Sequence, residues 1–231
     1  MSSRDRILDA VRTRLGRTTA TAVPPPPPLV AVGRTLAQEE RVAAFRTRLQ
    51  AVGGVVHEVA DAAAAAAVLR DVLAQHGASS LACSRAPLVH AVAGELRACA
   101  PAIRLHEDAD RDTLAAVDAG LTAASHGIAE TGTLILAEDL ERARLPSLLP
   151  PLHVALLPVT ALFSHLSEAL AGLPRPLPRA VTFVTGPSRT ADIELELVVG
   201  VHGPKALHVI LIAELWNAST MPAKDLGTPG G

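Results

Sequence analysis

Short apolar runs alternate with amphipathic stretches along the first half of the chain, from about residue 36 to residue 117. The runs favour strands, and the stretches between them repeat their apolar positions at helical spacing. The predicted strands are 55–59, 80–83 and 103–106, and the predicted helices are 36–52, 61–75 with Asp61 as its cap, 87–98 and 111–117. Strands that alternate with helices of about ten residues predict a parallel or mixed sheet covered on both faces. We therefore expect the α/β fold class.

The second half of the chain is richer in strands. Its apolar runs predict strands at 121–124, 133–137, 153–157, 181–185 and 207–213, and a helix is expected at 161–171. Residues 190–199 are ambiguous, because alternating acidic and apolar residues favour a strand, whereas Thr190 as a cap and Gly200 as a stop favour a short helix. We favour the helix. Its N-terminus would then follow the turn at 186–189, where free backbone N–H groups attract an anion.

Both ends of the chain depart from this regular pattern. Ser2 and Asp5 resemble a capping box at the start of an amphipathic helix with an arginine-rich outer face. Five consecutive prolines at 24–28 predict a stiff spacer, and the Pro- and Gly-containing tail is expected to be frayed. The predicted organisation is an N-terminal helix and Pro-rich linker at 1–33, an α/β domain at 34–218 and a flexible tail at 219–231.

Composition narrows the function classes. The 231-residue chain has a formal net charge of −2, no Tyr, one Trp and three Phe, so it lacks the basic excess and aromatic platforms typical of a nucleic-acid-binding protein. Cys83 and Cys99 are the only cysteines, too few for an iron–sulfur cluster or a structural cysteine zinc site.

No apolar run is long enough for a membrane span, and we expect a soluble, cytoplasmic protein. The nine histidines have no spacing that specifies a metal site, so no metal is predicted.

Two polar turns beside apolar strands carry the candidate chemistry. In the first, 127–133, Glu130 lies among small residues directly before an apolar strand. Partial desolvation there would raise the pKa of Glu130 and suit it to general acid–base or nucleophilic catalysis. The alternative is a loop glutamate that accepts hydrogen bonds from the backbone N–H groups of Thr131 and Thr133.

The second turn, 186–192, follows another apolar strand. Its Ser188 and Arg189 are suited to hold a carboxylate or phosphate, because a guanidinium makes a planar two-point contact with such anions. The alternative is that Arg189 pairs with Asp192 or Glu194 and stabilises the turn. We predict that the two turns lie side by side at one edge of the sheet, with the carboxylate of the first facing the guanidinium of the second. The candidate site has Glu130 as the catalytic residue and Thr131, Gly132, Thr133, Gly186, Ser188, Arg189, Thr190, Asp192 and His202 as substrate- or anion-binding residues.

Four stretches, in order, resemble the lactate utilisation protein C family, also called the LUD domain family. They are 127–133 (GIAETGT), 144–150 (RLPSLLP) leading to His153, 186–194 (GPSRTADIE) and 200–204 (GVHGP). The resemblance implies a three-layer α/β/α fold similar to that of sugar-phosphate isomerases and coenzyme A transferases, here with an N-terminal helical extension. It also implies a role in the oxidation of L-lactate to pyruvate, alongside two iron–sulfur partner subunits.

The resemblance leaves function classes open. The chain has no cysteine cluster and no dinucleotide-binding motif, so iron–sulfur clusters are expected only in the partners and no cofactor is expected on this chain. We expect an accessory or substrate-handling subunit that binds a small carboxylate or phosphate. One alternative is a free-standing enzyme similar to coenzyme A transferases with Glu130 as nucleophile, and another is an assembly module that docks through residues 1–33. The sequence leaves the oligomeric state open, and a homo-oligomer is one alternative.

Overall fold

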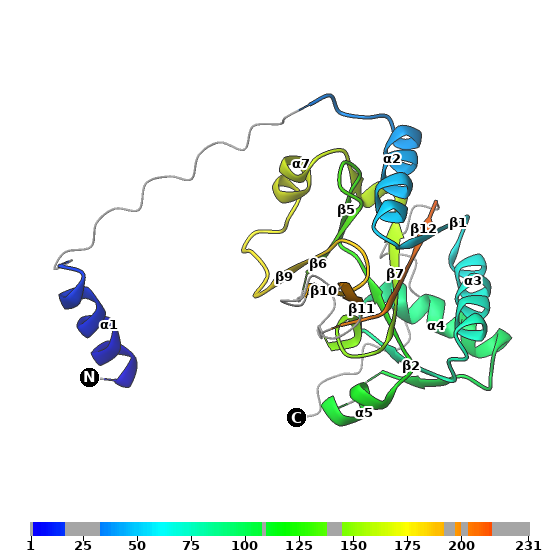
Figure 1. Ribbon diagram of the computed structural model, residues 1–231, viewed down its shortest axis with the longest axis horizontal. Helices are drawn as coiled ribbons and strands as arrows, with labels where there is room; N and C mark the ends of the chain where they lie inside the picture. The colour runs from blue at the N-terminus through cyan, green and yellow to red at the C-terminus, as the bar shows by residue number, and fades with distance from the viewer. Residues whose placement is uncertain are drawn as a thin grey trace, which may run out of the picture. The chain divides into compact units, whose positions relative to one another are not determined.

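The structure is a computed structural model that describes residues 2–16, 33–107, 110–137, 145–191, 197–199 and 203–213 (Figure 1). The chain divides into two compact units, Met1–Val30 and Ala31–Gly231. The first contains helix α1 (Ser3–Arg14), which begins with the predicted capping box: the Ser2 hydroxyl accepts from the Asp5 N–H, and the Asp5 carboxylate accepts from the Ser2 N–H. The prolines at 24–28 and the tail at 219–231 lie outside the described residues.

The second unit is built on a six-stranded sheet (Figure 1). Its strands, in spatial order, are β1 (Val55–Val59), β12 (Ala206–Ile212), β7 (Leu152–Pro158), β4 (Ala119–Ala123), β2 (Ser80–Cys83) and β3 (Arg104–His106). Every neighbouring pair in this sheet is parallel. The middle strands β7 and β12 are nearly continuous apolar runs because both of their faces are buried. The predicted α/β class with a mainly parallel sheet is confirmed.

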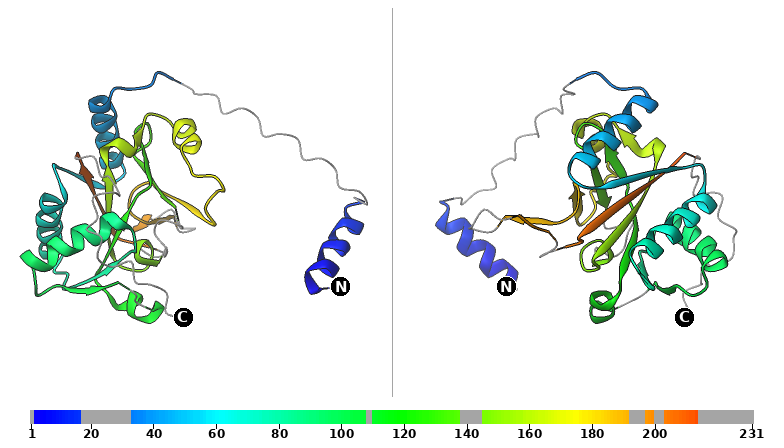
Figure 2. Two further views of the ribbon diagram at one scale, coloured as in Figure 1. Left: turned by 180° about the vertical axis from the view of Figure 1, so that it is seen from behind. Right: turned by 45° about the vertical axis from the view of Figure 1, so that its right-hand side comes forward.

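Two helices cover one face of this sheet (Figure 2). They are α3 (Ala62–Gln75) and α4 (Pro87–Cys99), and both pack in one core cluster with Val154 and Leu156 of β7. Local sequence signals set where they begin. The Asp61 carboxylate accepts a hydrogen bond from the Ala64 N–H, and proline occupies the first position of α4.

The opposite face of the main sheet carries α2 (Gln38–Ala51) and a smaller sheet. Phe45 and Leu49 of α2 pack there with Ala155 and Leu157 of β7, as the alternation of side chains along a strand requires. The smaller sheet has the spatial order β8 (Leu162–Phe163), β5 (His126–Ile128), β6 (Thr133–Ala137) and β9 (Val181–Val184). Short helical segments complete the unit: α5 (Arg111–Ala116), η1 (Leu145–Ser147), η2 (Val159–Ala161) and α7 (Leu166–Ala171). The main sheet therefore lies between two layers, and the second layer combines helices with the smaller sheet.

Two predicted helices need correction. The helix expected at 161–171 begins only at Leu166, because residues 162–163 form β8 and pair with β5. The helix favoured for 190–199 is wrong for the residues described there, since β10 (Arg189–Ala191) and β11 (Leu197–Val199) form an antiparallel pair. The strand that the sequence left open as the alternative therefore holds for the described residues at both ends of this stretch. Residues 192–196 lie outside the described part of the chain.

Candidate functional site

The two polar turns lie side by side, on the smaller sheet rather than at an edge of the main one. Strands β6 and β9 are antiparallel neighbours, with Leu134 paired to Val184, so the start of one strand lies next to the end of the other. The hydroxyl oxygens of Thr131 and Thr133 are 2.7 Å apart, and those of Thr133 and Thr185 are also 2.7 Å apart. A line of hydroxyl groups therefore joins the two turns.

Gly132 and Gly186 let both turns pack against the C-terminal end of α2. Each has a positive φ, 67° and 87° respectively, a conformation that favours glycine. A Cβ at Gly132 would lie 2.5 Å from the backbone nitrogen of Leu49, and a Cβ at Gly186 would lie 2.9 Å from a methyl carbon of Val52. These glycines, which the sequence presented as ligand-binding residues, thus also set how the turns pack.

Glu130 is held by a segment other than the second turn. Its Oε2 lies 2.9 Å from Nδ1 of His165, and its Oε1 accepts a hydrogen bond of 2.9 Å from the Leu166 N–H. The hydrogen bond with His165, followed by that from Leu166, holds the pKa of Glu130 below its usual value. This direction is opposite to the raised pKa expected for a catalytic acid, because the hydrogen bonds to the carboxylate outweigh its desolvation.

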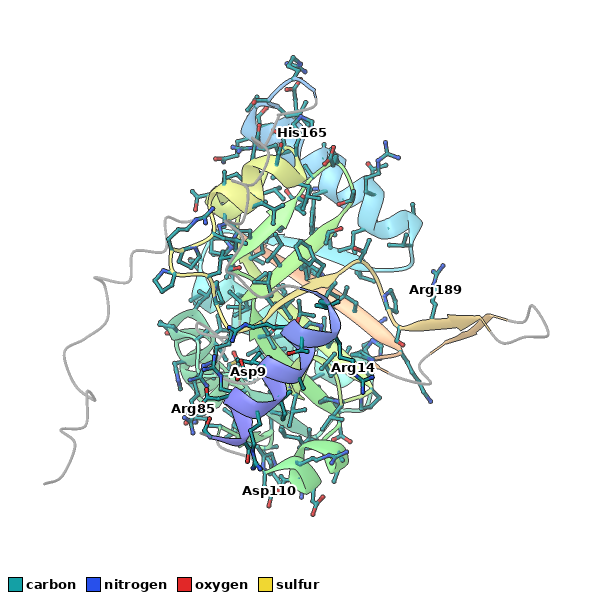
Figure 3. The ribbon with its side chains drawn as sticks, turned by 90° about the vertical axis from the view of Figure 1, so that its left-hand side faces the viewer. Asp9, Arg14, Arg85, Asp110, His165 and Arg189 are labelled. Atoms are coloured by element: carbon teal, nitrogen blue, oxygen red, sulfur yellow. The ribbon has the colours of Figure 1, made fainter. Side chains whose placement is uncertain are left out.

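Arg189 contacts helix α2. Its guanidinium Nη2 donates a hydrogen bond of 2.6 Å to the carbonyl oxygen of Val52, the C-cap residue of α2, where the helix dipole favours a cation. Figure 3 shows Arg189 well apart from His165, the partner of Glu130. The prediction that Glu130 faces Arg189 is therefore wrong. The predicted site residues Asp192 and His202 lie outside the described residues, and so does the side chain of Thr190.

A cavity of about 220 Å³ opens beside the second turn. Its wall combines η1, the starts of β7 and β12, and β9 with the turn that follows it. The lining residues are Ser147, Leu148, His153, Thr182, Phe183, Val184, Thr185, Gly186, Pro187, Ser188, Gly203, Pro204 and Leu207. Two predicted site residues, Gly186 and Ser188, are in this wall, whereas Glu130 and Arg189 are not in the lining that the structure describes.

His153 is the buried titratable group of the cavity wall. It is only 1% exposed, and its Nε2 lies 2.9 Å from the Thr122 hydroxyl oxygen. Burial lowers the pKa of His153 to about 4, because desolvation penalises the charged imidazolium. The ring is therefore neutral at pH 7 and offers one N–H donor and one nitrogen acceptor.

Ser147 and Ser188 bring hydroxyl groups to the same cavity. Ser147 belongs to η1, which approaches β4 so closely that a Cβ at Gly120 would lie 1.8 Å from the Pro146 carbonyl oxygen. Ser188 is fixed through its backbone N–H, which donates a hydrogen bond of 2.9 Å to the carbonyl oxygen of Pro204. The main chain thus positions both serines.

Ser147, His153 and Thr185 are cavity residues that the sequence-based site left out. For the first two, the available signal was the stretch 144–150 leading to His153, which contributes to the family resemblance. The wall provides hydroxyls and a neutral imidazole, and no formally charged side chain is among its described residues. Such an arrangement can bind a small polar molecule through hydrogen bonds.

The family of the chain follows from comparison with known proteins. The model of the LUD domain matches residues 42–212, well over half of the length. The chain belongs to the LUD domain family. Parts of this LUD domain protein are similar to curated proteins: it is 37% identical over 114 residues to the lactate utilization protein C of Exiguobacterium sp., which covers 47% of the chain and 50% of that relative. It is 34% identical over 101 residues to the Bacillus subtilis protein of that name, covering 41% and 42%.

A third relative, an uncharacterized protein of Neisseria meningitidis, is 39% identical over 99 residues, which cover 42% of each chain. The LUD domain protein thus matches half or less of the length of these relatives. Among solved structures, it resembles a DUF162 family protein from Deinococcus radiodurans with a TM-score of 0.58 and 21% identity, over 77% of this chain and 99% of that one. This likeness supports the fold.

The described residues also bear on membranes and metals. None of the helices found there has the length and apolar character needed to cross a bilayer. Within the same residues, no group of three or more His, Cys, Asp or Glu side chains is arranged to hold a metal ion.

Proposed function

We propose that this LUD domain protein acts in lactate utilisation as a substrate-handling subunit, and that its cavity holds L-lactate or pyruvate. The proposal is supported by which stretches of the chain line the cavity. Three of the four stretches that resemble the family contribute to it, through Ser147 and His153, Ser188, and Gly203. The relatives named lactate utilization protein C support the choice of ligand.

The size of the cavity and the hydroxyl groups in its wall suit a three-carbon acid. Its volume of about 220 Å³ is below the range of roughly 300 to 1,000 Å³ that is typical of drug-sized ligand pockets. The Ser188 hydroxyl is a donor for the carboxylate, and a hydrogen bond to an ionised group is about twice as strong as one between neutral groups. A neutral His153 can accept from the hydroxyl of lactate in one tautomer or donate to the oxo group of pyruvate in the other.

The redox step is assigned to partner subunits. Conversion of lactate to pyruvate breaks the C2–H and O–H bonds and releases two electrons and two protons. The sequence has two scattered cysteines and no dinucleotide-binding motif, so the electrons need an acceptor supplied by another protein. In this proposal iron–sulfur partner subunits accept the electrons, and the LUD domain protein binds and orients the acid.

The alternative of a coenzyme A transferase-like enzyme has less support. That chemistry needs a carboxylate free to attack an acyl group. Both oxygens of Glu130 instead accept hydrogen bonds, from His165 and from the Leu166 backbone. No observation on the described residues favours a nucleophilic role for Glu130.

Calorimetric titration with L-lactate and with pyruvate tests the binding proposal, with inorganic phosphate as the competing anion. Ser188→Ala should weaken acid binding by roughly tenfold or more, since a hydrogen bond to a charged group contributes about 1.5 to 3 kcal/mol. Thr160→Ala is the matched control, because it removes an exposed hydroxyl beyond the far end of β7. Absence of acid binding at millimolar concentration, or equal affinities in the two variants, would contradict the proposal.

Reconstitution with the iron–sulfur partners tests the role in the pathway. We expect lactate oxidation to fall when the LUD domain protein is omitted and to recover only partly with Ser188→Ala. An oxidation rate that does not depend on this chain would rule out the substrate-handling role, even if the acid binds.

A further inference from the structure

The segment 33–37 enters the α/β unit just before α2 and is fastened by a short stretch around α7. The Leu36 N–H donates a hydrogen bond of 2.8 Å to the Ser164 hydroxyl, and the Thr35 hydroxyl donates one of 2.7 Å to the carboxylate of Glu168. Nε2 of His165 lies 3.1 Å from the carbonyl oxygen of Arg34. Three successive residues of the segment are thus bound to residues 164–168.

His165 makes two contacts that set its protonation state. Its Nδ1 lies 2.9 Å from Oε2 of Glu130, and its Nε2 lies 3.1 Å from the Arg34 carbonyl oxygen. An ionised carboxylate and a backbone carbonyl can only accept hydrogen bonds, and a neutral imidazole has a single N–H. Both contacts can therefore be hydrogen bonds at once only when His165 is the doubly protonated imidazolium.

The charged groups around His165 favour this state. Glu130 faces it from the turn between β5 and β6, and Glu168 faces it from α7; the hydrogen bond to Glu130 is the largest cause that raises the pKa of His165, and the bond to Arg34 is the next. The guanidinium of Arg34 is turned to Glu40, 2.8 Å away. Gly33 permits the close approach of the segment, since a Cβ there would lie 2.7 Å from Cε1 of His165.

We infer that Glu130 and His165 form a protonation-dependent latch that fastens segment 33–37 to the α/β unit. When His165 loses a proton, the remaining N–H stays on Nδ1, against the carboxylate. The lone pair of Nε2 then faces the lone pairs of the Arg34 carbonyl oxygen, and that contact becomes repulsive. The segment is held below the raised pKa of His165 and is released as the pH rises through it. The latch is independent of the ligand proposed for the cavity.

Hydrogen exchange of the full chain, followed by mass spectrometry from about pH 6 to about pH 9, tests the latch across the range where a raised histidine titrates. After correction for the intrinsic pH dependence of exchange, protection of a peptide covering 33–37 should fall as the pH rises. Protection of peptides from α3 and α4 should stay constant over the same range. Protection of 33–37 that does not change with pH would overturn the inference.

Variants separate the latch from a merely structural contact. In Glu130→Gln, the amide N–H can donate to Nδ1 of neutral His165, which leaves the Nε2–H for Arg34, so the segment should stay protected at every pH. His165→Ala should lower its protection at every pH to the level that the parent chain reaches at high pH, and His90→Ala, on α4, should behave as the parent chain. A pH-dependent loss of protection in Glu130→Gln equal to that of the parent chain, or unchanged protection in His165→Ala, would refute the latch.

Discussion

Among single residues, Gly120 marks the close approach of η1 to the main sheet. A Cβ there would lie 1.8 Å from the Pro146 carbonyl oxygen, so Gly120→Ala must displace the backbone that carries Ser147. We expect a loss of about 1 to 3 kcal/mol in the free energy of unfolding, the usual cost of overpacking, together with weaker ligand binding. Gly94→Ala is the matched control: it lies in α4 with nothing within 4 Å of the added carbon, and should stabilise by about 0.5 to 1 kcal/mol. Urea denaturation of both variants measures the difference, and equal effects would contradict the close packing.

His208 links three imidazoles into a hydrogen-bonded chain. Its Nδ1 lies 3.0 Å from Nε2 of His57, and its Nε2 lies 3.1 Å from Nε2 of His76. Burial, followed by the charges of these neighbours, lowers the pKa of His208 to about 4. The unfolded chain therefore binds a proton more readily than the folded one, and the stabilising contribution present above the unfolded value of about 6.5 is lost as the pH falls toward 4.

This difference predicts that the free energy of unfolding falls by about 1 to 2 kcal/mol between pH 7 and pH 5, after a discount for solvent screening. His208→Leu removes the titrating group, so its unfolding free energy should depend less on pH by that amount. His153 titrates in the same direction and stays in both proteins, so the difference between them reports His208 together with its contacts to His57 and His76. Denaturant titrations at both pH values measure the change. A pH dependence in His208→Leu as steep as in the parent chain would show that the histidine chain does not resist protonation.

Among the helices and strands, α2 is contacted at its C-terminal end by Arg189. Its hydrogen bond to the Val52 carbonyl oxygen satisfies a helix-terminal acceptor, so Arg189→Ala should lower the free energy of unfolding by about 0.5 to 1 kcal/mol. The affinity for lactate or pyruvate should stay within about twofold, a difference of about 0.4 kcal/mol. Arg179→Ala, at another exposed arginine, is the control for lost surface charge. A large loss of acid affinity in Arg189→Ala alone would instead restore the anion-binding role expected from the sequence.

Elements with local boundary signals were predicted well from the sequence. β1 has the limits that its apolar run and the preceding glycines indicated, and α3 begins after its Asp61 cap. The strands β5 and β8 were missed because they have three and two residues, too few to show a period, and because β8 forms by pairing with a strand distant in the sequence. The strands β10 and β11 have three residues each, and at 190–199 a helix-cap signal competed with the strand pattern, so their pairing was not predicted.

For the molecule as a whole, the sequence predicted that the two turns lie together, but it did not predict which groups their charged side chains contact. Strands leading into each turn were enough to bring the turns side by side. The partners of the charged groups could not be predicted, because His165 is 35 positions from Glu130 in the sequence and Val52 is 137 positions from Arg189. Glu130 and Arg189, which were paired because of their opposite charges, therefore make two separate structural contacts. The described lining of the cavity consists of uncharged residues.

The division of the molecule into Met1–Val30 and Ala31–Gly231 gives a last prediction about where the α/β unit begins. Deletion of residues 1–30 should leave the Tm of the remaining chain unchanged at pH 6, because the latch and all its partners are retained. Deletion of residues 1–36 removes three hydrogen bonds to the stretch 164–168, each contributing about 1 kcal/mol. At about 2 to 4 °C for each kcal/mol in a protein of this size, the Tm should fall by roughly 6 to 12 °C.

Thermal unfolding followed by circular dichroism measures both truncations. Because release of the latch at high pH already removes the contact between His165 and Arg34, the gap in Tm between the two truncated chains should narrow from pH 6 to pH 9, a range of about 3 units across the histidine titration. A gap that stays constant would show that the segment is held by its other hydrogen bonds regardless of the proton on His165. A fall in Tm on deletion of residues 1–30 alone would mean that the stable unit begins before residue 31.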